Sequence, residues 1–433
     1  MTKRLSHCAT IELSMPARYR TADQAWVRER NLSIVLNYLW EAGGPIARAR
    51  LTEISGLNKS TIGNLLTSLQ AWGFVRETGT QSIGPGRPGA LIDLNPDAGR
   101  IIGTEIGVDF ISVVLADLKA NVVWRRKIDT NGAAKPGQPQ VMVQAELIVR
   151  EAMHQAEASG QRVLGIGLGV PGLIDHATGT LLFAPNLGWK DVPLREMWGA
   201  AFGVPVIVEN EANAAALGER MLGVGKEKDH FIYLSAGVGL GGGLVIDGKL
   251  VGGAGGFAGE IGHMTLVPDG PQCNCGNRGC WETLIGPTAI KERVQQAAAL
   301  GQTPWLLALP EVNGDVAAIR MRHILAAAEQ GEVAVLHVLD EVGRYLGIGI
   351  ASLVNALNPS LVVLGGVLSL AGPYILPRAQ QEVNARALAA SRAGVEICLS
   401  VFKFDACVMG GVSLIVREIL GNPEAWQPGN IVP

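Results

Sequence analysis

Apolar residues recur at helical spacing in the N-terminal quarter of the chain, where they predict three short helices. The first begins near Arg28 and ends at Gly43-Gly44-Pro45, and the second spans about Ile46 to Ile54. After the turn Ser55-Gly56-Leu57, Asn58 is suited to cap the third helix, which Gly73 ends. The apolar stripes of the first and third helices are Leu32, Val35, Leu36 and Leu39, and Ile62, Leu65, Leu66 and Leu69.

The second and third helices, joined by a three-residue turn that contains glycine, have the layout of a helix-turn-helix motif. The early polar residues of the third helix lie off its apolar stripe, so they are free to face the major groove of DNA. Residues 74–94 read as two strands around the loop 84–89, a wing whose arginine resembles those that enter a minor groove. A three-helix bundle with a solvated face is the alternative. The candidate DNA contacts are Lys59, Ser60, Thr61, Asn64 and Arg87.

Beyond residue 98, runs typical of strands and helices follow one another in an order that predicts an α/β body of two lobes. The predicted domains are an arm at 1–25, a winged helix-turn-helix at 26–97 and the body at 98–433. Lobe 1 would take about 98–219 plus the C-terminal helix, and lobe 2 about 220–404. The predicted strands are 101–108, 111–116, 121–128, 163–168, 204–208, 231–235 and 361–364, and the predicted helices lie near 138–158, from 210, within 286–358 and at about 409–420.

Charge is distributed unevenly along the 433 residues, of which 48% are hydrophobic and 17% charged. Residues 1–90 carry a net charge of +5 and the remainder −8, so the total of −3 conceals a basic N-terminal end. Such an end favours a polyanionic partner, although a chance surface fluctuation is the alternative. No apolar run has the length of a membrane span and no signal peptide is recognisable, so we expect a cytoplasmic protein without a membrane partner.

Three of the six cysteines lie within eight residues, which favours metal binding over disulfides in a chain without an export signal. Cys273, Cys275 and Cys280, with His263 ten positions before the first, offer three sulfurs and one nitrogen. Four such ligands suit tetrahedral Zn²⁺ and leave no open position for a catalytic water. We therefore expect one structural zinc per chain; three unpaired thiols in a surface loop are the alternative.

The cysteine block is also the point at which the chain resembles a known family. His263-x9-Cys273-x-Cys275-Gly276-x2-Gly279-Cys280-Trp281-Glu282, after Glu260-Ile261-Gly262, resembles the ROK family of repressors and sugar kinases. Similar matches are Gly169–Gly172, Pro185–Trp189, Glu209–Asn213 and Gly237–Gly243, in the family's order. The resemblance implies a two-lobed actin/hexokinase-like fold with a sugar in the cleft and His263 shared between zinc and sugar. It implies sugar contacts from Asn186, Asn210, Glu211, Glu260, His263 and Glu282.

Two departures from the family's kinase pattern argue against phosphoryl transfer. ROK kinases carry Asp-x-Gly-Gly-Thr-Lys/Arg to hold ATP phosphates, whereas this chain has Glu105-Ile106-Gly107-Val108-Asp109-Phe110. The Asp109 carboxylate would repel a phosphate, and Glu211 stands where kinases carry an aspartate as general base. We therefore expect no enzyme activity, with a ROK sugar kinase as the alternative.

The expected function is that of a sugar-responsive transcriptional regulator. Glu209–Asn213 is more similar to the xylose-repressor branch of the family than to its glucose branches, so xylose or a related monosaccharide is the expected effector. A single helix-turn-helix rarely gives enough affinity for DNA. We therefore expect a homodimer on a two-fold symmetric operator.

Overall fold

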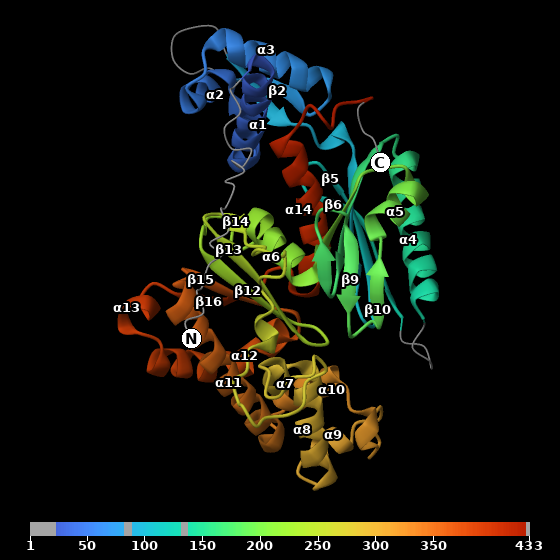
Figure 1. Ribbon diagram of the computed structural model, residues 1–433, viewed down its shortest axis with the longest axis vertical. Coiled ribbons are helices and arrows are strands. Elements are labelled where there is room, and N and C mark those ends of the chain that lie inside the picture. The colour runs from blue at the N-terminus through green and yellow to red at the C-terminus, as the bar shows by residue number, and fades with distance from the viewer. Residues whose placement is uncertain (1–22, 82–88, 131–136, 430–433) are drawn as a thin grey trace, which may run out of the picture.

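The computed structural model describes residues 23–81, 89–130 and 137–429. A small N-terminal domain stands at one end of a two-lobed α/β body (Figure 1). The domain has three helices and a three-stranded antiparallel sheet of order β1-β3-β2. Its elements are α1 (Gln24–Ala42), β1 (Ile46–Ala47), α2 (Arg48–Ser55), α3 (Lys59–Ala71), β2 (Val75–Gln81) and β3 (Gly89–Leu94).

The predicted helix-turn-helix is present, with the predicted cap at Asn58 and the predicted turn at Gly56. The Asn58 side chain accepts a hydrogen bond from the Thr61 backbone N–H at 2.8 Å, which satisfies a free donor at the start of α3. Gly56 ends α2 with a positive φ of 69°, a conformation that glycine adopts without strain. The apolar stripe of α3 is buried. Arg87 of the predicted wing lies outside the described residues, as do residues 1–22 of the predicted arm.

The first lobe is built on a five-stranded sheet of order β11-β7-β4-β5-β6, in which β4, β7 and β11 are parallel. A small antiparallel sheet of order β10-β9-β8, which the sequence pattern does not predict, lies beside it. The elements are β4 (Arg100–Ile106), β5 (Phe110–Asp117), β6 (Val122–Asp129), α4 (Gln138–Ala158), β7 (Val163–Val170), β8 (Leu173–Asp175), β9 (Thr180–Ala184), β10 (Trp189–Val192), α5 (Leu194–Phe202), β11 (Val206–Asn210) and α6 (Glu211–Leu222).

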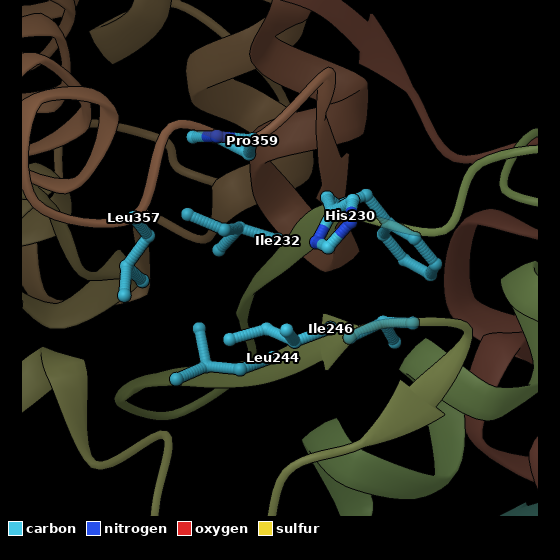
Figure 2. A pocket seen from close by; sticks show the side chains of 8 residues that line it. His230, Ile232, Leu244, Ile246, Leu357 and Pro359 are labelled. Carbon is cyan, nitrogen blue, oxygen red and sulfur yellow. The ribbon is translucent and has the colours of Figure 1, made fainter.

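The second lobe has a sheet of order β14-β13-β12-β15-β16 and a group of helices below it in Figure 1. At one end of β12, beside His230 and Leu357, the packing leaves a cavity of about 10 Å³, room for a single water rather than a ligand (Figure 2). The elements are β12 (Phe231–Ala236), β13 (Leu240–Ile246), β14 (Lys249–Leu250), α7 (Glu282–Ile285), α8 (Pro287–Ala299), α9 (Pro304–Leu307), α10 (Met321–Glu329), α11 (Val333–Leu357), β15 (Leu361–Gly365), α12 (Gly366–Arg386), α13 (Ala389–Arg392) and β16 (Glu396–Leu399).

The C-terminal helix α14 (Ala406–Gly421) runs from the body to the N-terminal domain, between α1 and the first sheet (Figure 1). A side-chain carbon at Gly103 or Gly167 of the sheet would collide with the backbone of α14, and one at Gly410 would collide with Ala214 of α6. At its far end, α14 shares one buried core with the apolar stripe of α1. The helix α14 therefore packs closely on the sheet and on α6 at glycines, and it contacts the N-terminal domain through apolar side chains.

In the part of the chain that the structure describes, no helix is both long and apolar enough to cross a membrane.

Candidate functional site

The junction between β11 and α6 places Asn210 and Glu211 at the end of a parallel strand, close to Gly241 of the second lobe. We call the region between this junction and the turn at 237–243 the cleft. The Asn210 side-chain oxygen caps α6 by accepting from the N–H groups of Ala212 (2.9 Å) and Asn213 (3.2 Å). Its Nδ2 donates to Gly172 O at 3.1 Å and to Glu211 Oε2 at 2.8 Å. The helix cap therefore also fixes the orientation of the Glu211 carboxyl.

The glycine-rich turn at 237–243 brings two more of the predicted residues, Asn186 and Glu282, close to Glu211. A side-chain carbon at Gly239 would collide with Oε2 of Glu282 and would lie 3.9 Å from Nδ2 of Asn186. One at Gly241 would lie 3.5 Å from Oε1 of Glu211. Because these positions lack side chains, carboxylates and an amide from distant segments can surround the turn, as a sugar with several hydroxyls requires.

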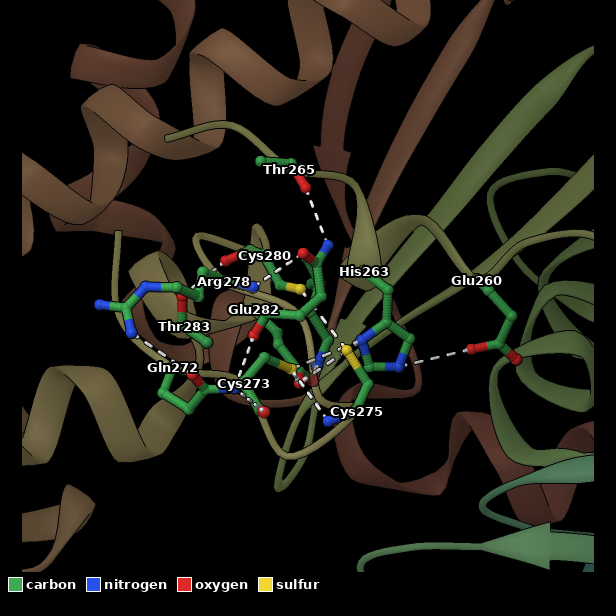
Figure 3. A network of polar contacts seen from close by, with 12 residues as sticks. Glu260, His263, Thr265, Gln272, Cys273, Cys275, Arg278, Cys280, Glu282 and Thr283 are labelled. Atoms are coloured by element: carbon green, nitrogen blue, oxygen red, sulfur yellow. Dashed lines mark hydrogen bonds and ion pairs between the residues drawn. The ribbon is translucent and has the colours of Figure 1, made fainter. Parts of the chain in front are cut away.

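The three clustered cysteines and His263 form a compact group of donor atoms (Figure 3). Their four candidate ligand atoms all lie within 4.8 Å of one another. The Sγ atoms of Cys275 and Cys280 are 3.7 Å apart, as are Cys273 Sγ and His263 Nδ1. Ligands about 2.3 Å from a tetrahedral metal ion lie roughly 3.8 Å apart. The group can thus hold a metal ion with little rearrangement.

His263 connects this cluster to the cleft. Its Nδ1 faces the cysteines, while its Nε2 lies 3.8 Å from Oε2 of Glu260 (Figure 3). Glu282 also lies between the cysteine cluster and the cleft. Its Oε1 accepts a hydrogen bond from the Cys273 thiol at 2.8 Å, and its Oε2 accepts one from the Leu240 N–H at 3.4 Å. Two predicted sugar residues are therefore in direct contact with the predicted metal ligands.

Burial raises the pKa of three carboxyl groups in or beside the cleft, so they are weaker acids than usual. It raises the pKa of Glu211 from 4.5 to about 8, with the nearby Glu105 and Glu260 adding to the shift. Burial also raises the pKa of Glu105, which lies on β4 and is 8% exposed, to about 8, although Lys127 lowers it in part. The pKa of Glu260 is raised by partial burial as well. The cleft can therefore contain neutral carboxyl groups at neutral pH, and these donate hydrogen bonds as well as accept them.

The hairpin between β4 and β5 occupies the position where the ROK kinase pattern holds phosphate. The Gly107 N–H donates to Phe110 O at 2.9 Å, and a side-chain carbon at Gly107 would lie 2.6 Å from the Phe110 ring. The Lys127 ammonium also lies over that ring, 3.9 Å from its centre. An aromatic ring thus covers the glycine of this turn.

One pair beside the cleft was missed in the sequence. His176 Nε2 lies 2.8 Å from Oε1 of Glu209, and this hydrogen bond raises the pKa of His176. Glu209 Oε1 also accepts from the Asn210 N–H at 2.9 Å. A side-chain carbon at Gly256, in the loop before Glu260, would lie 2.9 Å from Nδ1 of His176. A lone histidine in a turn gives no periodic signal, so only the structure reveals that it contacts both lobes.

The predicted DNA contacts of α3 lie together on its outward side. Lys59, Ser60 and Asn64 are exposed and Thr61 is half-buried. The Ser60 hydroxyl donates to the Asn58 side chain at 2.7 Å, so it is partly engaged in the cap. Thr61 and Asn64 also line a groove of about 360 Å³ between α1 and α3. The described residues thus present polar side chains on the side of α3 that lies off its apolar stripe.

A winged helix-turn-helix on a two-lobed actin/hexokinase-like body defines the class of protein. The ROK family model matches residues 101–418, and the chain belongs to the ROK family. The model of the IclR helix-turn-helix domain matches residues 33–79.

Three similar proteins extend this assignment. The xylose repressor of Caldicellulosiruptor bescii is 35% identical over 381 residues, which cover 88% of this chain and 94% of that protein. A ROK family transcriptional regulator, a homologue of Escherichia coli MLC, has a crystal structure that matches with a TM-score of 0.78 and 29% identity, covering 92% of this chain and 97% of that one. A ROK family glucokinase from Streptomyces griseus, in complex with glucose and AMPPNP, matches with a TM-score of 0.66 and 32% identity, covering 73% and 99%. The two similar regulators thus span nearly the whole chain, while the kinase covers the body.

Proposed function

We propose that this chain is a transcriptional repressor that binds operator DNA as a homodimer and responds to xylose or a related monosaccharide. The helix-turn-helix and the ROK body support DNA binding and sugar sensing. The similarity to a xylose repressor supports the choice of sugar. The observation that carries the proposal is α14, which joins the α6 helix beside the candidate sugar site to the DNA-binding domain through direct contacts.

We propose that the sugar is held by the six residues that surround the turn at 237–243 and the adjoining cleft. Their carboxylates and amides can form paired hydrogen bonds with neighbouring hydroxyls, and a ligand that left these groups unpaired would bind weakly. The pKa of Glu211, which burial raises to about 8, adds a hydrogen-bond donor to the set. The proposed contacts are Asn186, Asn210, Glu211, Glu260, His263 and Glu282.

We propose further that His263, Cys273, Cys275 and Cys280 hold one structural zinc ion. The sulfur and nitrogen donors and their spacing suit this metal. A metal-bound Cys273 would be a thiolate, which cannot donate the hydrogen bond that Glu282 Oε1 accepts from the thiol. Metal binding would thereby release Glu282 for a sugar hydroxyl, while fixing the ring of His263.

The absence of kinase activity is also a proposal, supported by the β4–β5 hairpin. The Phe110 ring covers Gly107 where kinases of the family cradle phosphates, and the neutral Glu105 carboxyl is a poor ligand for a magnesium ion. The alternative is a ROK sugar kinase, as the similarity to a glucokinase would allow. Sugar-dependent ATP hydrolysis separates the two: a repressor should show none above background.

The test is operator affinity with and without saturating xylose, using a sequence selected from random duplex DNA. The wild type should lose about 5–150-fold in affinity when sugar is present. Glu260→Gln should keep the sugar-free affinity and lose the response, because Glu260 lies in the cleft and not in the DNA-binding domain. Glu157→Gln, on the exposed side of α4, is the control and should respond normally. A Glu260→Gln variant that responds like wild type would contradict the assignment of the cleft.

A further inference from the structure

Gly63 lies in the middle of α3, where glycine weakens a helix relative to alanine. The structure gives a reason for its presence. A side-chain carbon at Gly63 would lie 2.8 Å from Nη2 of Arg48 and 3.8 Å from its Cζ. The guanidinium of Arg48 therefore rests directly on α3 at this residue, and an alanine would displace it.

The guanidinium lies among the candidate DNA contacts. Arg48 is the first residue of α2 and is exposed. Gly63 is one helical turn beyond Lys59 and is not part of the buried apolar stripe, so it belongs to the outward side of α3. The side chain of Arg48 thus spans the two helices of the motif and ends on the surface that would face DNA.

The positive charge of Arg48 is not engaged elsewhere in the described part of the chain, where no carboxylate lies within ion-pair distance of it. Arg50, two residues later on the same helix, pairs with Glu53 at 2.7 Å. A free guanidinium beside a recognition helix suits a phosphate oxygen, which it can bind through two parallel hydrogen bonds. The two arginines of α2 therefore differ in their readiness to bind an anion.

We propose that Arg48, seated over Gly63, is a further DNA-contacting residue that binds a backbone phosphate at the edge of the major groove that α3 enters. The inference rests on the proposed DNA-binding function. A phosphate is the expected partner because the guanidinium lies against α3 at Gly63 and carries no ion pair among the described residues, and contacts to phosphates position a recognition helix without reading sequence. Arg48 would then set the depth and angle of α3 without reading sequence.

The first experiment measures binding of the full chain to a random-sequence duplex and to a selected operator over a range of salt concentrations. Arg48→Ala should weaken both by a similar factor, on the order of ten-fold. It should also reduce the magnitude of the salt slope by about 1, because one phosphate is no longer neutralised by the protein. Arg50→Ala is the matched control and should leave the slope unchanged, because its charge is already paired with Glu53.

The second experiment is a double-mutant cycle. Gly63→Ala should fold at least as stably as wild type, because the colliding atom is the flexible end of a side chain, yet it should bind DNA less tightly. In the Arg48→Ala background the same change should have no further effect on affinity.

Several outcomes would overturn the inference while the wild type still binds DNA. They are an Arg48→Ala variant with unchanged affinity and salt slope, fully additive effects of the two changes, or a weakening confined to one base position of the selected operator. That last result would make Arg48 a base-reading residue. A wild-type chain that selects no operator would instead contradict the proposed function itself.

Discussion

Replacement of Glu105 by glutamine should change how the stability of this protein depends on pH. Glu105 is almost fully buried on β4, and its Oε2 has no hydrogen-bond partner among the described residues. Its pKa is raised by burial from 4.5 to about 8 in the folded protein. Between these two values the unfolded chain ionises this carboxyl and the folded chain does not. The carboxyl therefore destabilises the fold progressively as pH rises through this window.

The magnitude follows from proton linkage. Each pH unit inside the window costs about 1.4 kcal/mol per group. From about pH 5.5 to 7.5 the Glu105 carboxyl should therefore lower the free energy of unfolding by about 3 kcal/mol. Below pH 4.5 the Glu105 carboxyl is protonated in the folded and the unfolded chain, and above about pH 8 it is ionised in both. Its effect on the free energy of unfolding therefore stops changing outside this window. Glu211 has a raised pKa of similar size and contributes in the same direction.

Glu105→Gln keeps the shape of the neutral carboxyl and cannot ionise, so this part of the pH dependence should disappear while that of Glu211 remains. The assay is urea unfolding followed by tryptophan fluorescence at about pH 5.5, 6.5 and 7.5, where the folded and unfolded states differ in protonation. The difference in urea midpoint between variant and wild type, multiplied by their common m-value, gives the difference in the free energy of unfolding. This difference should grow in favour of the variant by about 1.4 kcal/mol per pH unit. A constant offset from changed hydrogen bonding does not affect this slope.

Glu292→Gln, at an exposed position of α8, is the matched control and should leave the slope as in wild type. If Glu105→Gln shows the same pH dependence as wild type, Glu105 is ionised in the folded protein at neutral pH. A charged carboxylate, and not a neutral carboxyl, would then occupy the phosphate position of the kinase pattern.

Two further predictions concern the metal and the link to DNA. Cys275→Ser should lower the zinc content, measured by elemental analysis, well below one ion per chain and should weaken sugar binding. Cys398→Ser, outside the cluster, is the control and should do neither. Full zinc occupancy in Cys275→Ser would refute the ligand set. Arg28→Gln removes an ion pair with Glu424 (3.2 Å), which at its exposure contributes no more than about 1 kcal/mol to stability. Thermal stability should therefore change little, while the effect of sugar on operator affinity should weaken. Arg30→Gln is the exposed control, and an Arg28→Gln variant with the full response would exclude this contact from the coupling.

The helix-turn-helix could be predicted from sequence because its signals are local. An Asn cap, a glycine stop and one apolar stripe specify α3 over 13 residues, and all three are confirmed. The core of the winged domain is, however, continuous with that of α14: the stripe of α1 shares one cluster with this helix, more than 360 positions away in the chain. Periodicity indicates which side of a helix is buried but not which element covers it.

The helix α12 shows where local rules fail. It contains Pro373 and Pro377, and proline inside a helix removes a backbone hydrogen bond and ordinarily ends or kinks it. In this protein α12 continues because it packs closely on α11, where side-chain carbons at Gly343 and Gly347 would collide with its backbone. No helix was predicted for this segment, because the compensating contacts are tertiary.

The candidate site was located by its motifs, which carry no information on distances in the fold. Residues between positions 186 and 282 meet around one turn because glycines at 239 and 241 leave room for their side chains. The contact of Glu282 with Cys273 could not be predicted, since it depends on how the metal loop folds back on the cleft. His176 was missed for the same reason: its partners lie in two lobes.

The shared core of α1 and α14 limits how a sugar could alter DNA binding. Because α14 contacts the first sheet and α6 at glycines and also forms part of the core of the DNA-binding domain, these parts should move as one body. Closure on a sugar would then displace the second lobe relative to that body, not the recognition helix relative to its own lobe. In a homodimer, such a displacement would change the distance between the two recognition helices, which must match half-sites about one helical turn apart. By linkage, operator DNA would oppose the same displacement and weaken sugar binding by an equal factor.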